Sequence, residues 1–171
     1  MSNLSGRPTV SLDRSASGPT GICGWLILPI IGFVGTIVLT GMNLLQALNE
    51  TDGLVAIFRA TSGPLVAIKV PTALSLVAGG LVIASGSYCL YLIFAKKHAI
   101  INFATAHYLI LASAGLIDIW TVATLQQAMP NTPSDPTVFS NAFRGIVIAC
   151  IWIPYFRVSK RVRNTFKNPT A

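Results

Sequence analysis

The chain has 171 residues, of which 53% are hydrophobic and only 10% are charged, and its 12 basic and 5 acidic residues give a net charge of +7. Soluble domains have about 25% charged residues, so this composition excludes an ordinary soluble globular protein, which would lack the polar side chains to cover its surface. Because the basic residues lie at the ends of apolar runs, the positive charge favours anionic lipid over nucleic acid as a partner.

Four apolar runs follow a polar N-terminal segment, residues 1–20, which we expect to be disordered and cytoplasmic. The runs cover approximately residues 22–47, 72–95, 103–126 and 139–156. The first two carry no charge, the third contains Asp118, and the fourth contains Arg144. About 20 apolar residues cross the hydrocarbon core of a bilayer as a helix. We therefore predict an all-α integral membrane protein with four transmembrane helices, in a transmembrane domain over residues 21–156.

The segments between the runs indicate the orientation. Both ends of the chain are basic, and Lys96 and Lys97 fill the short second loop, whereas the third loop, residues 127–138, has one acid and no base. Basic loops stay on the cytoplasmic side, so both termini and the Lys96–Lys97 loop are predicted to be cytoplasmic. In the first loop, residues 48–71, the apolar stretch 54–58 predicts a short helix resting on the outer surface.

Asp118 and Arg144 are the best functional leads, because an ionisable residue within a membrane helix is costly and usually faces the bundle interior. A short loop joins their helices, which makes the two side chains antiparallel neighbours of similar depth in the outer half. Three interpretations stay open: a structural ion pair that locks the hairpin, a charged group in a substrate or ion path, and independent snorkelling of the side chains to the outer surface. Asn43 and Gln46 are candidates for the same polar layer.

The remaining reactive side chains form no recognisable site. His107 lies eleven residues before Asp118, about 16 Å along a helix, so the two cannot ligate one metal, and we expect His107 near the cytoplasmic interface. Cys23, Cys89 and Cys150 form no C-x-x-C motif, and neither a disulfide nor a zinc site is indicated. No catalytic motif or phosphate-binding loop is found. We therefore expect no enzyme activity, no metal and no cofactor.

The stretch IWIPYFRVSKRVRNTF, residues 151–166, changes abruptly from apolar to basic. Trp152 and Tyr155 are typical of a membrane–water boundary, and beyond them the residues project as a basic amphipathic helix. We expect the tail, residues 157–171, to be cytoplasmic, with its basic face toward the anionic inner leaflet. The alternatives are a simple positive-inside anchor, or docking on the protein's own cytoplasmic face or on a partner. The basic anchor residues are Arg157, Lys160, Arg161, Arg163 and Lys167.

This stretch and GICGWLILPIIG near the start resemble the two signature segments of an uncharacterised bacterial membrane family, domain of unknown function 2569. The resembling positions are Gly21, Gly24, Trp25, Leu26, Pro29, Arg144, Trp152, Pro154, Tyr155, Phe156, Ser159, Arg161, Val162, Thr165 and Phe166. Cys23 departs from the Gly expected there. The resemblance covers about residues 20–167 and implies four membrane helices in the bacterial inner (cytoplasmic) membrane. It implies no activity.

Two classes of function fit these features. The first is a non-catalytic accessory, scaffolding or regulatory subunit of a bacterial inner-membrane complex, which has another membrane protein or a second copy of itself as its partner. The second is a small oligomeric transporter or channel that uses the Asp118/Arg144 layer. Gly80-x-x-x-Ala84 and Gly145-x-x-x-Ala149 fit the spacing by which small residues let membrane helices approach closely. Packing within the bundle or between copies would use these positions.

Overall fold

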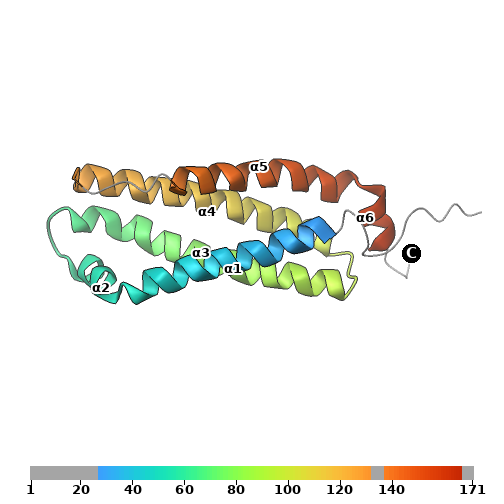
Figure 1. Ribbon diagram of the computed structural model, residues 1–171, viewed down its shortest axis with the longest axis horizontal. Coiled ribbons are helices and arrows are strands. Elements are labelled where there is room, and N and C mark those ends of the chain that lie inside the picture. Colours follow the sequence, from blue (N-terminus) through green and yellow to red (C-terminus); the bar gives the residue numbers. More distant parts are fainter. Residues whose placement is uncertain (1–26, 132–136, 167–171) are drawn as a thin grey trace, which may run out of the picture.

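The computed structural model describes residues 27–131 and 137–166. These residues form six α-helices (Figure 1): α1 (Ile27–Asn49), α2 (Thr51–Arg59), α3 (Leu65–Phe94), α4 (Ile100–Ala128), α5 (Thr137–Val158) and α6 (Lys160–Thr165). Four of them, α1, α3, α4 and α5, are long and apolar enough to cross a membrane. This confirms the predicted set of four apolar helices and indicates a multi-pass membrane protein. The predicted N-terminal segment, residues 1–20, lies outside the described residues.

The start of α3 was predicted seven residues too late. The predicted first loop ended at Pro71, and the second apolar run was predicted to begin directly after it. In the structure α3 begins at Leu65 and continues through Pro71. The chain turns before it at Gly63, whose φ of 82° is in the left-handed region that favours glycine. The short helix expected over residues 54–58 is confirmed as part of α2.

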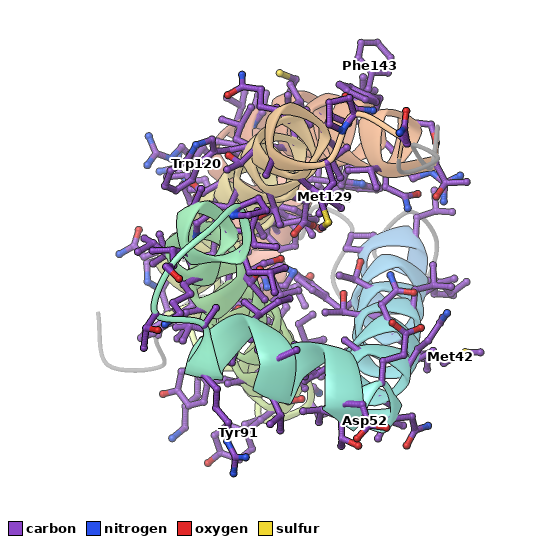
Figure 2. All side chains as sticks on the ribbon, turned by 90° about the vertical axis from the view of Figure 1, so that its left-hand side faces the viewer. Met42, Asp52, Tyr91, Trp120, Met129 and Phe143 are labelled. Carbon is purple, nitrogen blue, oxygen red and sulfur yellow. The ribbon has the colours of Figure 1, made fainter. Side chains whose placement is uncertain are left out.

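The long helices surround the interior of the bundle, and each packs mainly on its neighbour in chain order. α1 packs against α3, α3 against α4, and α4 against α5, while no comparable interface joins α1 to α5 among the described residues. α2 lies at one end of the bundle, here called the α2 end, and α6 lies at the opposite α6 end. The labelled side chains of Met42, Trp120 and Phe143 point away from the bundle in Figure 2, and all three are more than 45% exposed. Such outward apolar side chains suit contact with lipid.

Small residues set the closest contact between α4 and α5. A Cβ atom added to Gly115 would lie 2.9 Å from the Cα of Ala142. Gly145 and Ala149 are buried on the same face of α5, as the small-residue pattern predicted. The Gly80/Ala84 pair behaves differently, because Gly80 has no described neighbour within 4 Å of an added Cβ and Ala84 is exposed. Only the second of the two predicted motifs therefore packs helices within this bundle.

A buried aromatic core fills the α6 end. Phe33 of α1 stacks on Tyr108 of α4, with ring centroids 5.5 Å apart, and Tyr108 contacts Phe156 of α5 at 6.3 Å. These rings belong to one buried cluster, whose other fully or almost fully buried members are Cys89, Leu92, Ile93, Ile100, Ala104, Ala149, Val162 and Phe166. Helices α1, α4 and α5 are thus held together at this end.

The C-terminal segment does not continue as one straight amphipathic helix. α5 ends at Val158, and the backbone of Ser159 is extended. The side-chain hydroxyl of Ser159 accepts a hydrogen bond from the Val162 N–H at 3.4 Å and thereby caps α6. Because this break resets the helical register, Val158 is 75% exposed while Val162 and Phe166 are fully buried in the core. Val162 and Phe166, two apolar residues of the predicted amphipathic helix, therefore pack in the protein's own core, whereas Val158 does not.

Candidate functional site

A polar cavity lies between all four long helices in the half of the bundle nearer the α2 end. Its volume is about 190 Å³, well above the roughly 10–15 Å³ that a single water molecule needs. Each helix contributes a polar lining residue: Thr40 and Asn43 from α1, Ser75 from α3, Asp118 from α4 and Asn141 from α5. A polar chamber inside an otherwise apolar bundle is costly in a membrane, so it is the leading candidate for a functional site.

Asp118 is the one carboxylate in this chamber among the described lining residues, and it is half-buried. Its Oδ1 accepts a hydrogen bond from the Ser75 hydroxyl of the neighbouring helix α3. A carboxylate can accept about four hydrogen bonds, so one hydroxyl leaves most of its capacity directed at the cavity. Ser75 orients Asp118, and the remaining lone pairs are available to a ligand or to water.

The chamber opens in two directions. Toward the α2 end it widens into a cleft of about 540 Å³, where Gln46, Glu50 and Thr121 join the lining. Sideways, between α1 and α5, it meets a groove of about 240 Å³. Asn43 and Asn141 line all three spaces, so the spaces are contiguous. Figure 2 looks along the bundle from the α2 end, with α1 on the right, α3 on the left, and α4 and α5 at the top.

Toward the α6 end the interior is filled. Val82 lines the chamber with only 1% of its surface exposed. Beyond it lie the side chains of His107, Phe33 and Tyr108, which are 1%, 1% and 3% exposed. The described residues therefore form a pocket with a floor rather than a path along the whole bundle.

Residues 19–167 match the family described as "Protein of unknown function (DUF2569)". The chain belongs to this family. The match includes every described helix and the whole cavity, and it confirms the resemblance seen in the terminal signature segments. We found no curated protein and no solved structure that matches the chain.

In this DUF2569 member Asp118 and Arg144 line neighbouring spaces without forming an ion pair within the described residues. Asp118 lies in the central chamber with Ser75 as its partner, whereas Arg144 is exposed and lines the lateral groove. The cause is the position of Arg144 around the axis of α5. Ala142 and Gly145 face α4, and Arg144 lies on the adjoining face with Asn141, toward α1. Asn141 therefore lies between the two charged groups as a shared lining residue.

The polar layer has more members than the two charges. Asn43 and Gln46 were predicted to join it, and both line the cavity system. Ser75 was missed, because one serine in an apolar helix is ordinary, and only the rotation of α3 toward Asp118 gives it a role. Asn141 was missed for a similar reason. A search for polar residues at matching depth on all four helices would have found both.

His107 lies inside the protein rather than at an interface as predicted. Its ring is 1% exposed, and its Nδ1 is 2.8 Å from the hydroxyl of Ser85 on α3. The Nε2 atom has no hydrogen-bond partner among the described residues. Gly86 makes room for the ring, since an added Cβ would lie 3.2 Å from its Cε1. This pair forms part of the closed interior beyond the cavity floor.

The predicted boundary residues lie at the α6 end. Trp152 and Tyr155 are half-buried and meet edge to face with ring centroids 5.2 Å apart, and the Tyr155 hydroxyl is buried without a partner among the described residues. Arg157, Lys160 and Arg163 are exposed. The side chain of Arg161, and Lys167 as a whole, lie outside the described residues. The described basic side chains are therefore free to meet lipid head groups or a partner.

Proposed function

We propose that this protein is a non-catalytic accessory or regulatory subunit of a bacterial inner-membrane complex, whose polar cavity is a binding pocket open at one end. The floor of the cavity is the observation that supports this proposal. A channel needs a continuous polar route through the bundle, whereas here Val82, His107 and Phe33 are at most 1% exposed. A pocket with a floor suits binding, and binding can regulate a partner.

We assign the α6 end to the cytoplasm. Lys96, Lys97, Arg157, Lys160 and Arg163 belong to that end, and basic residues favour the cytoplasmic side. Both termini are then cytoplasmic, and the cavity opens toward the outer face and sideways into the bilayer. The unpacked edge between α1 and α5 also supports docking of another membrane protein, because two lipid-exposed helices there lack a neighbour on one side.

The test is affinity purification of the full chain in a mild detergent, followed by mass determination and identification of whatever is bound. We expect a larger membrane protein in a stoichiometric complex. Purification of only this chain, as a monomer or homo-oligomer that makes liposomes permeable to ions, would refute the accessory role.

A small transporter is the second candidate, and a carboxylate inside a polar cavity is the observation that favours it. Asp118 would then bind the transported ion or proton. Liposomes that contain the purified protein should show substrate or proton flux, and Asp118→Asn should abolish it. Absence of flux for any small cation leaves the accessory role as the better explanation.

A further inference from the structure

We propose that the cavity binds the head group of a zwitterionic phospholipid with a primary ammonium, placing the ammonium at Asp118 and the phosphate at Arg144. This inference rests on the binding pocket of the proposed function and names its ligand. The two charged groups lie in contiguous spaces joined by Asn43 and Asn141. Asp118 and Arg144 do not neutralise each other, because the described residues contain no ion pair between them.

The pattern of charge selects a zwitterion over a simple ion. A free cation at Asp118 would be repelled by the nearby guanidinium of Arg144, and a free anion at Arg144 would be repelled by the carboxylate. A ligand that carries both charges a few bonds apart satisfies both residues. Guanidinium groups bind phosphate through paired N–H donors, so Arg144 suits the phosphate.

The chamber suits a primary ammonium more than a quaternary one. A primary ammonium has three N–H donors, and the chamber offers acceptors in the carboxylate of Asp118, the hydroxyl of Thr40 and the side-chain carbonyls of Asn43 and Asn141. A quaternary ammonium donates no hydrogen bond and is recognised by cages of aromatic rings. The described residues that line the three spaces include no aromatic side chain.

The lateral groove gives such a lipid its way in. Its walls combine polar side chains at Thr40, Asn141 and Arg144 with apolar side chains at Leu39, Leu111 and Ile148. Leu39 is 56% exposed on the outside of α1. Because α1 and α5 do not pack closely, a head group can enter between them while its acyl chains stay in the bilayer along these apolar walls. A soluble zwitterion would not need an opening toward the bilayer.

The test is native mass spectrometry of the delipidated full chain, titrated with phosphatidylethanolamine, phosphatidylcholine, phosphatidylglycerol and the soluble glycerophosphoethanolamine. We expect retention of phosphatidylethanolamine at least about tenfold above the other lipids, since one hydrogen bond to a charged group changes an affinity by roughly this factor or more. Asp118→Asn and Arg144→Gln should each remove most of this preference, and Asp118→Glu should keep it. Asp52→Asn and Arg59→Gln are matched controls on α2, outside the cavity lining, and should bind as the wild type does.

Wild-type protein that retains phosphatidylcholine or phosphatidylglycerol as strongly as phosphatidylethanolamine overturns the proposal, whether or not any variant folds. Glycerophosphoethanolamine that binds as tightly as the lipid overturns the lipid source and assigns a soluble ligand. A stoichiometric partner without lipid preference would refute this inference alone, while lipid preference without a partner would refute the accessory role alone.

Discussion

The contact between Gly115 and Ala142 predicts that even a methyl group will separate α4 from α5. In Gly115→Ala the new Cβ would lie 2.9 Å from the Cα of Ala142 and 3.1 Å from its Cβ. Carbon atoms pack best at about 3.5–4.0 Å, so the helices must move apart by roughly 0.6–1.1 Å at this crossing. Such overpacking costs about 1–3 kcal/mol. Gly115 also lines the cavity, so the shift would displace Asn141 from its place opposite Asp118.

The matched control is Gly80→Ala on α3, where an added Cβ meets no described atom within 4 Å. Both variants replace a helical glycine, so the intrinsic gain of roughly 1 kcal/mol in helix propensity cancels when the two are compared. Reversible unfolding in mixed detergent micelles measures both free energies. We expect Gly115→Ala to be less stable than Gly80→Ala by about 1–3 kcal/mol. Equal stabilities would show that the close approach of α4 and α5 does not exist.

The other predictions test the remaining contacts and the orientation. Phe166→Ala should lower the free energy of unfolding by about 3–5 kcal/mol because the ring is fully buried; the exposed Lys160→Ala should have little effect, and similar losses in both would contradict the docking of α6. Ser75→Ala should cost about 1–3 kcal/mol by removing the donor to Asp118, whereas Ser113→Ala, whose hydroxyl bonds its own helix at Leu109, serves as control. An impermeant maleimide applied to intact cells should label Asp52→Cys and leave Lys97→Cys unlabelled, and the reverse pattern would invert the assigned orientation.

The four long helices were predictable because apolar runs of helix-spanning length with at most one charge have few other structures available in a membrane. Their ends were harder to predict. Pro71 suggested a boundary, yet a proline near the start of a membrane helix removes only one backbone hydrogen bond, and α3 continues through it. At the other end of the chain α5 contains Pro154 and continues to Val158, and the break occurs at Ser159. The cap at Ser159 depends on Val162 and Phe166 docking into the core, which is tertiary information.

The sequence was enough to predict how far along their helices the site residues lie, but not the direction in which their side chains face. Sequence spacing places Asp118 and Arg144 in the same half of adjacent antiparallel helices, and both line the cavity system there. Which way each side chain faces depends on the close contact at Gly115 and Ala142, because that contact fixes the rotation of α5 against α4. Arg144 consequently faces α1, and Asp118 faces Ser75. No single helix contains this information.

The two ends of the bundle restrain α1 unequally. At the α6 end Phe33 lies against His107 and Tyr108 of α4, with ring centroids 5.0 and 5.5 Å apart, and through Tyr108 it is linked to Phe156 of α5. Among the described residues the main partners of α1 are α2 and α3, and the space toward α5 in the half nearer the α2 end is the polar cavity with its lateral groove. Buried aromatic contacts resist displacement far more than the lining of a polar cavity does. If a ligand widens the groove, the packing of Phe33 favours a tilt of α1 about this residue, which would move Thr40 and Asn43 away from α5 while the closed end stays packed.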